Sequence, residues 1–183
     1  FITWPEGDFV RLLFHELAHQ KVYAKGDTLF NESFASAVGN LGSATWLRTQ
    51  ADAPTRAAFA VAEQQRESFR ALVRSTRAQL ADIYEQKSTL ALDDKALAAM
   101  KNEAFAQFRL RYQTLATGWA LPPPQRTSYD HWVQRANNAS FGAQAAYDAW
   151  VPAFQSLFVQ CGSDWQRSGS SASTKARSRI SAM

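Results

Sequence analysis

The stretch 54–87, PTRAAFAVAEQQRESFRALVRSTRAQLADIYEQK, contains no glycine, and its one proline stands at the first position. A set of residues within it recurs at alternating steps of four and three, which is the spacing of a helix that packs along one seam. The members of this seam are Ala62, Arg66, Phe69, Val73, Thr76, Leu80 and Ile83. We therefore predict one long helix here, with a partner helix of similar length packed against the seam.

The partner is predicted directly downstream, over residues 94–117, after the polar stretch 87–94. Its larger apolar residues fall on one helical face. They are Leu97, Phe105, Phe108, Tyr112 and Leu115. Because a short polar connection between helices is typical of antiparallel neighbours, the sequence predicts a long antiparallel helical hairpin.

Helical periodicity continues on both sides of the hairpin. The 183 residues include only 8 glycines and 6 prolines, and no run alternates with the period of a strand. Further helices are predicted from Glu6 to a turn at Gly26, over 28–48, and over 128–160 with a break near 128–138. The first of them should bury a stripe made of Phe9, Leu12, Leu13 and Leu17. The prediction is an all-α fold in which a helix pair precedes the hairpin and carboxy-terminal helices follow it.

One globular domain is predicted over residues 1–162, because the apolar content of 46% is enough for a core. Residues 163–183 are rich in serine and basic side chains, so we expect a disordered tail, with a nucleic-acid or anionic-lipid arm as the alternative. Segment 166–183 holds 4 of the 20 basic residues and no acid, so the other 16 balance the 16 acidic residues. A neutral body gives no reason to infer a nucleic-acid partner.

Three further features of the sequence limit what can be inferred about membrane spans, disulfides and the extent of the protein. No apolar run reaches the roughly 18 residues of a membrane-spanning helix, so no membrane span is expected in this chain. The single cysteine, Cys161, cannot form an internal disulfide, and a buried or idle thiol is its expected state. The chain starts at Phe1 without an initiator methionine, directly ahead of the motif described next, and we expect it to be part of a longer protein.

The segment His15-Glu16-Leu17-Ala18-His19 has the pattern H-E-x-x-H within the first predicted helix. Because a helix turns by about 100° per residue, the two histidines lie one turn apart on the same face and can bind one metal ion. In metalloproteases with this pattern the glutamate is the general base that takes a proton from zinc-bound water. The alternative is a helix whose histidines have this spacing by chance. We predict a zinc site with His15 and His19 as ligands and Glu16 as the catalytic base.

A third ligand must come from elsewhere in the chain. The metzincin continuation would need glycine at position 22 and histidine at position 25, whereas this chain has Val22 and Lys25. Since His19 precedes Gly26 by seven residues and Glu32 follows it by six, an antiparallel turn there would place the two opposite each other. Glu32 is therefore the predicted third ligand, with a solvated acid in a first helical turn as the alternative. Two histidines and one glutamate leave a fourth zinc position open, as in catalytic sites.

These motifs carry a family resemblance. Residues 15–20 (HELAHQ) followed by residues 31–36 (NESFAS) resemble the HELAHQ and NEGFAS motifs of gluzincin peptidases, the thermolysin-like and zinc aminopeptidase group. The longer string over 13–35 is similar to a bacterial family of predicted aminopeptidases. The carboxy-terminal residues that fit the same family are Asn137-Asn138-Ala139, Tyr147 and Pro152-Ala153-Phe154. The resemblance implies a zincin-type metal helix pair, bound Zn²⁺, a peptide substrate, and a location in the cell envelope or periplasm.

Peptide hydrolysis also needs a donor for the oxyanion, and related zinc peptidases place a tyrosine or histidine there. Tyr129 or His131 is the predicted donor, with a packing role for the tyrosine and a surface or core position for the histidine as alternatives. Asn137 and Asn138 are predicted to bind the substrate backbone through their amides, or else to cap the helix that follows.

The function that the resemblance implies is a zinc-dependent peptidase, an aminopeptidase, that hydrolyses peptide bonds through a zinc-activated water. One residue departs from the pattern: zinc aminopeptidases usually have a second-shell glutamate seven residues after the ligand glutamate, and this chain has Gly39. Gly39 favours the alternative, a non-catalytic zinc-binding helical module whose hairpin binds a partner. The presence of Glu16 speaks against it, because a purely structural zinc site has no use for a base.

Overall fold

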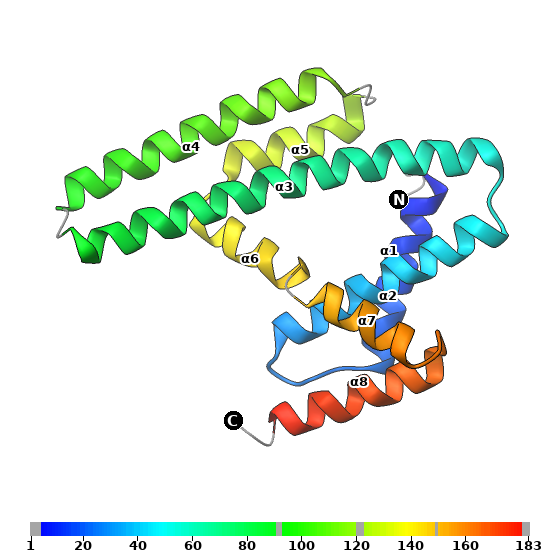
Figure 1. Ribbon diagram of the computed structural model, residues 1–183. Helices are drawn as coiled ribbons and strands as arrows, with labels where there is room; N and C mark the ends of the chain where they lie inside the picture. The colour runs from blue at the N-terminus through cyan, green and yellow to red at the C-terminus, as the bar shows by residue number, and fades with distance from the viewer. Residues whose placement is uncertain (1–4, 91–92, 120–122, 149, 181–183) are drawn as a thin grey trace. The chain divides into compact units, whose positions relative to one another are not determined.

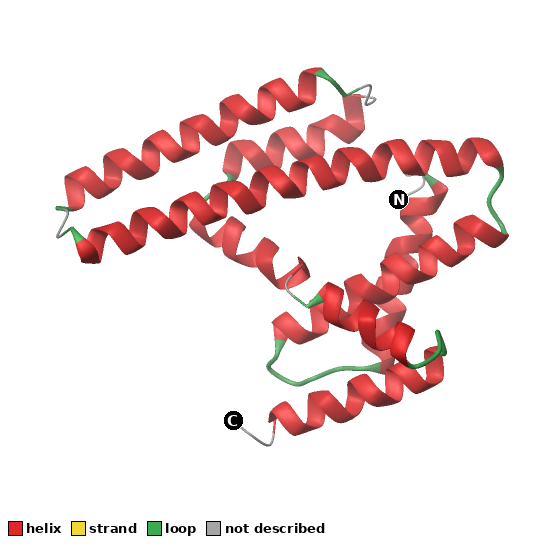
Figure 2. Ribbon diagram, in the orientation of Figure 1, coloured by secondary structure: helices red, strands yellow, loops and turns green. Residues whose placement is uncertain are grey.

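The computed structural model of the chain describes residues 5–90, 93–119, 123–148 and 150–180. These residues form eight α-helices and no strand, as Figures 1 and 2 show. The helices are α1 (Glu6–Lys21), α2 (Thr28–Thr49), α3 (Ala53–Thr89), α4 (Asp94–Thr117), α5 (Pro123–Arg135), α6 (Asn138–Asp148), α7 (Val151–Gln160) and α8 (Trp165–Ile180). The predicted all-α fold is confirmed. Over the same residues, each helix is too short or too polar to cross a membrane.

The chain divides into two compact units, and the single domain over 1–162 stays a prediction. The first unit consists of Phe1–Ala60 and Ala143–Met183, and the second of Val61–Gly142. Each unit has its own cluster of buried apolar side chains. The predicted hairpin therefore builds a core of its own, which the continuous helical periodicity of the sequence did not indicate.

The second unit is built on the predicted hairpin of α3 and α4, which run antiparallel in Figure 1. The seam residues of α3 that are buried are Phe69, Val73, Thr76, Leu80 and Ile83, and α4 contributes Leu97, Phe108 and Tyr112. Helices α5 and α6 complete the core with Val133 and Phe141. The ring of Trp132 contacts Phe69, Phe108 and Phe141 at centroid distances of 5.4, 6.1 and 5.6 Å. The hairpin and its packing seam are thus where the sequence predicted them.

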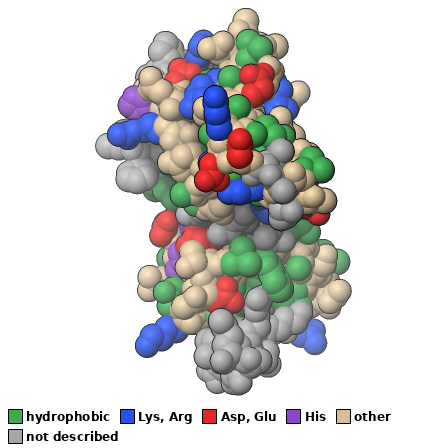
Figure 3. All heavy atoms as spheres, turned by 90° about the vertical axis from the view of Figure 1, so that its left-hand side faces the viewer, with side chains coloured by type: hydrophobic (Ala, Val, Ile, Leu, Met, Phe, Trp, Pro, Cys, Tyr) green, Lys and Arg blue, Asp and Glu red, His purple; other side chains and the backbone are tan. Residues whose placement is uncertain are grey.

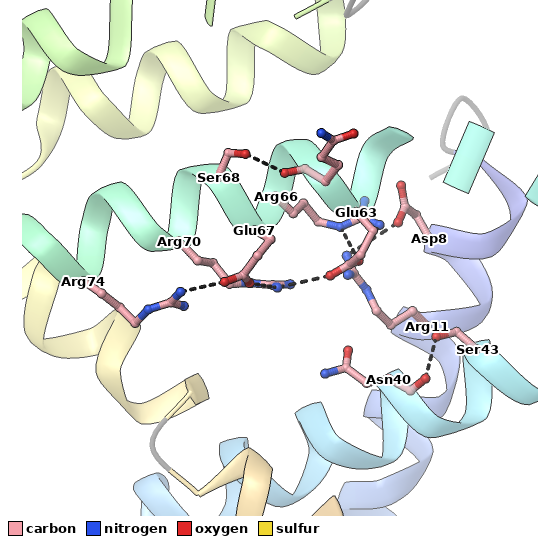
Figure 4. A network of polar contacts seen from close by, with 11 residues as sticks. Asp8, Arg11, Asn40, Ser43, Glu63, Arg66, Glu67, Ser68, Arg70 and Arg74 are labelled. Atoms are coloured by element: carbon pink, nitrogen blue, oxygen red, sulfur yellow. Dashed lines mark hydrogen bonds and ion pairs between the residues drawn. The ribbon is translucent and has the colours of Figure 1, made fainter. Parts of the chain in front are cut away.

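Ion pairs between acidic and basic side chains follow one another along α3 (Figure 4). Glu63 pairs with Arg66 at 2.8 Å and with Arg70 at 3.1 Å. Glu67 pairs with Arg70 at 3.1 Å and with Arg74 at 2.6 Å. Each such pair contributes only about 0.3–0.5 kcal/mol, and less at high salt. On the face drawn in Figure 3, basic side chains likewise lie among acidic ones rather than in a patch of one sign.

A buried tyrosine in the second unit makes its stability depend on pH. The hydroxyl of Tyr112 donates a 2.6 Å hydrogen bond to Asp130 Oδ1. Burial, followed by this hydrogen bond and the negative charge of Asp130, raises the pKa of Tyr112 well above its usual range. The unfolded chain therefore loses the phenol proton near pH 10, whereas the folded chain keeps it to higher pH. The contribution of Tyr112 to the free energy of unfolding is complete below about pH 10 and is lost as the pH rises above that value.

We expect the free energy of unfolding to fall as pH rises above about 10, by up to about 1.4 kcal/mol per pH unit from this group alone. Tyr112→Phe should remove that contribution and should cost about 1 kcal/mol at neutral pH through the lost hydrogen bond. Urea unfolding at pH 8 and pH 10.8 measures both variants. The same pH dependence in wild type and Tyr112→Phe would contradict this account.

The first unit contains α1, α2, α7 and α8. Three phenylalanines form the centre of its core: Phe154 of α7 meets Phe30 and Phe34 of α2 edge-on, at centroid distances of 5.1 and 5.3 Å. The backbone N–H of Trp150 also donates to Ser33 Oγ at 3.3 Å, which ties the start of α7 to α2. This packing joins α7 to α2, and Ala18 at the end of α1 belongs to the same buried cluster.

The carboxy-terminal segment differs from the expected disordered tail over 163–183, because residues 165–180 form α8. Asp164 caps this helix by accepting a hydrogen bond from Arg167 N–H at 2.9 Å. Ala172 is completely buried in the core of the first unit, and Ser168 is also buried. Small residues at helical spacing let the helix pack closely, a pattern that a serine-rich, basic composition conceals.

The apolar stripe expected to be buried on α1 is largely exposed, so that prediction is wrong. Phe9, Leu13 and Leu17 are 47%, 46% and 52% exposed. The buried positions of this helix are Gly7 and Ala18 instead. Small residues bring α1 close to its neighbours, and the large side chain that packs against α2 is Phe14, which was not in the predicted stripe.

Candidate metal centre

Two glycines of α2 allow α1 to approach it closely. A Cβ atom on Gly39 would lie 2.9 Å from the backbone oxygen of Arg11 and 3.5 Å from His15 Cβ. A Cβ atom on Gly42 would lie 2.5 Å from Cγ of the Phe14 ring. The two helices lie side by side in Figure 1, and the absence of side chains at these positions sets their separation. Gly39 is thus a close-contact position beside His15, and a glutamate there would overlap α1.

Gly39→Ala should lower the free energy of unfolding by about 1–3 kcal/mol, because the added methyl group meets the backbone of α1. Gly142→Ala is the matched control, since an added Cβ in α6 meets nothing within 4 Å. That control should raise stability by about 0.5–1 kcal/mol through higher helix propensity. Urea denaturation followed by circular dichroism measures both variants, and an unchanged or raised stability of Gly39→Ala would refute the close approach.

The structure brings the three predicted metal ligands together. Nε2 of His15 lies 3.4 Å from Glu32 Oε2, and Nε2 of His19 lies 3.7 Å from Glu32 Oε1. The two imidazole rings are edge to face, with centroids 5.0 Å apart. One nitrogen or oxygen from each residue belongs to a set whose members all lie within 4.8 Å of one another. The antiparallel turn at Gly26, with φ of +83°, places Glu32 against the histidines as the sequence predicted.

The surroundings of the cluster suit a metal. All three side chains are half-buried, with exposed fractions of 17%, 22% and 20% for His15, His19 and Glu32. Burial, followed by the charge of His19, lowers the pKa of His15, while Glu32 and Glu16 act in the opposite direction. A lowered pKa keeps an imidazole neutral at physiological pH, which is the form that binds metal ions.

The donor set fits zinc. Two imidazole nitrogens and one carboxylate are a common catalytic zinc set. Ligand atoms about 2.0–2.1 Å from a tetrahedral ion lie roughly 3.3–3.4 Å apart, close to the observed 3.4 and 3.7 Å to Glu32. The partial exposure of the cluster leaves room for a water molecule or a substrate. These three residues could therefore hold one zinc ion with an open position.

The predicted catalytic residues lie in different parts of the chain. Glu16 is on α1 between the two histidines, and its side chain is exposed. Tyr129 and His131 are on α5, in the second unit. The ring of Tyr129 packs against Phe69 and Trp119, at centroid distances of 4.9 and 5.0 Å, whereas His131 is exposed. The packing alternative thus describes what the structure shows of Tyr129, and the donor role of either residue stays a prediction.

The two predicted substrate-binding asparagines are also in the second unit. Oδ1 of Asn137 accepts a 3.1 Å hydrogen bond from Ser140 N–H at the start of α6. This is the geometry of a helix cap, which was the alternative for Asn137. The side-chain amide of Asn138 donates to the hydroxyl of Tyr84. Both amides have partners in this structure, and substrate binding by them stays a prediction.

Sequence reasoning missed the residue next to the third ligand. Asn31 is only 4% exposed, and its amide contacts the loop between α1 and α2. The signal that could have found it is an amide one residue after Phe30 and three before Phe34, since an amide buried among such residues needs hydrogen-bond partners.

Comparison with known proteins adds one finding. The family model described as "Putative aminopeptidase" matches residues 1–179. A comparison with curated proteins and a comparison with solved structures both find no match. The resemblance to an aminopeptidase family is confirmed over nearly the whole chain, while its gluzincin group and bacterial origin stay predictions.

Proposed function

Because the chain belongs to the family described as putative aminopeptidases, we propose that it is a zinc-dependent aminopeptidase. The observation that carries the zinc part of this proposal is the convergence of His15, His19 and Glu32 from two helices. The family match supports peptidase chemistry and a peptide substrate. Removal of amino-terminal residues, as opposed to internal cleavage, rests on the family description alone.

In the proposed mechanism, His15, His19 and Glu32 hold the metal, which when bound supplies Lewis acidity for a water molecule and for the scissile carbonyl. Glu16 accepts the proton of the attacking water and delivers it to the nitrogen of the leaving amine. Its exposed position, one residue from His15, suits a group that meets solvent and substrate.

The remaining roles stay as the sequence suggested them. We propose Tyr129 or His131 as the donor to the oxyanion that develops on the carbonyl. Asn137 and Asn138 are the proposed contacts to the substrate backbone.

The test is hydrolysis of aminoacyl reporter substrates by the metal-free protein as zinc is added. We expect hydrolysis to appear with zinc and to saturate at about one ion per chain. A peptide with a blocked amino terminus should be a poor substrate if the enzyme is an aminopeptidase. Zinc binding without cleavage of any peptide would refute the enzyme proposal and favour the non-catalytic zinc-binding module. Cleavage that persists in a strong chelator would refute zinc dependence.

A further inference from the structure

The loop between the two metal-binding helices has a defined and buried conformation. Val22 and Ala24 are buried, although they belong to no helix. Asp27 N–H donates to Ala24 O at 3.1 Å, and Asp27 caps α2 by accepting from Phe30 N–H at 2.9 Å. Gly26 has the positive φ that this turn requires. The loop is therefore fixed at its exit by the start of α2.

Asn31 fixes the middle of this loop. Its Oδ1 accepts from Ala24 N–H at 2.7 Å, and its Nδ2 donates to Ala24 O at 2.8 Å. The side-chain amide thus pairs with both polar backbone groups of one loop residue, as a neighbouring strand would. Both hydrogen bonds are buried. Ala24 O also accepts from Asp27 N–H, whereas losing the bond to Oδ1 would take from the buried N–H of Ala24 the acceptor that Asn31 provides.

We propose that Asn31 is a positioning residue for the metal ligands, an inference that rests on the proposed zinc site. It precedes Glu32 in the same helical turn, and it holds Ala24, which is five residues after His19. The pair of hydrogen bonds sets how far α2 is shifted along α1. That shift decides whether the Glu32 carboxylate stands opposite the histidines at the observed 3.4 and 3.7 Å.

The amide is the side chain that fits both partners. An aspartate has the same shape and can still accept from Ala24 N–H, but it cannot donate to Ala24 O and places a negative oxygen against it. Groups that orient metal ligands without touching the metal typically change metal affinity by about 10–100-fold. We therefore expect Asn31→Asp to bind zinc about 10–100-fold more weakly than wild type.

Ser33→Ala provides a matched structural control. Ser33 lies on the other side of Glu32 and is fully buried, and its hydroxyl accepts a partly buried hydrogen bond from the backbone N–H of Trp150. Its loss should lower the melting temperature, and Trp150 is the residue before α7 rather than part of the loop between the metal-binding helices. A purely structural role for Asn31 would give the same pattern as Ser33→Ala.

The experiment measures the zinc dissociation constant by competition with a chelator, the visible spectrum of the cobalt(II) form, and thermal unfolding of the metal-free chain. Asn31→Asp should bind zinc more weakly and change the cobalt spectrum, whereas Ser33→Ala should match wild type in both. If Asn31→Asp does not fold, Asn31→Ser replaces it, since its short hydroxyl cannot reach both groups of Ala24.

The outcomes separate the two proposals. Unchanged zinc affinity and cobalt spectrum in a folded Asn31 variant would overturn the positioning role and leave the proposed zinc site intact. A wild-type chain that binds no zinc would refute the proposed function, and with it the basis of this inference. Zinc binding without peptidase activity would refute only the enzyme, because metal affinity is the readout here.

Discussion

Glu16→Gln should lower kcat/KM for aminoacyl substrates by about 100- to 10,000-fold, the range that a positioned general base typically contributes. Glutamine keeps the size and polarity of the side chain but cannot accept the proton of the attacking water. Since Glu16 lies beside the three ligands and is not one of them, the variant should bind zinc as wild type does. The measurement pairs steady-state kinetics with the zinc content of the same preparation.

Glu6→Gln is the control for this change. Glu6 is an exposed glutamate in the first turn of the same helix, so the substitution removes the same charge from α1. It should leave kcat/KM close to the wild-type value. Wild-type activity in Glu16→Gln would sink the proposed mechanism, even if zinc were present.

Loss of a metal ligand is the second large effect. Glu32→Ala should weaken zinc binding by roughly 100-fold or more, because removing a ligand exceeds the 10–100-fold effect of removing an outer-shell partner. The two histidines that remain would hold the ion through two ligands instead of three. Isothermal titration or chelator competition measures the change, and activity at low zinc should fall with it.

The chain offers controls for both types of ligand. Glu6→Ala removes an acid from the same helix pair and should not change zinc affinity. His19→Ala should weaken binding as Glu32→Ala does, while His131→Ala, the third of three histidines, should bind zinc like wild type. Undiminished affinity in Glu32→Ala would show that the third ligand has been assigned wrongly.

The long elements of the fold could be predicted because their signals are repeated many times. Helix α3 was predicted over 54–87 and spans Ala53–Thr89, and α4 was predicted at its observed bounds. Because the seam of α3 has seven positions, the polar residues at two of them, Arg66 and Thr76, do not hide the apolar pattern. Periodicity over many turns therefore determined both the helices and the faces that pack.

Apolar periodicity did not predict the helix contacts that are made through small residues. The exposed Phe9, Leu13 and Leu17 had the size of core residues, but α1 meets α2 at Gly39 and Gly42. Helix α8 is held through Ala172 for a related reason. The free energy of such contacts comes from close approach of backbones, which hydrophobic periodicity does not register. The division into two units also depends on tertiary contacts.

The metal ligands could be predicted because their geometry is local. His15 and His19 are one turn apart, and Glu32 follows a short turn whose glycine is visible in the sequence. The meaning of Gly39 was not visible in the same way. It was compared with the glutamate that zinc aminopeptidases usually have there, whereas in this chain a Cβ at position 39 would lie 2.9 Å from the backbone oxygen of Arg11, which leaves no space for a side chain.

The most direct test of the zinc site is X-ray absorption at the zinc K-edge on the complex of one zinc ion per chain. The account predicts two imidazole nitrogens with oxygen ligands at about 2.0–2.2 Å and no sulfur. Loss of one imidazole in His19→Ala should follow. A sulfur ligand at about 2.3 Å, which would place the ion on Cys161, or a spectrum without two imidazoles would contradict it.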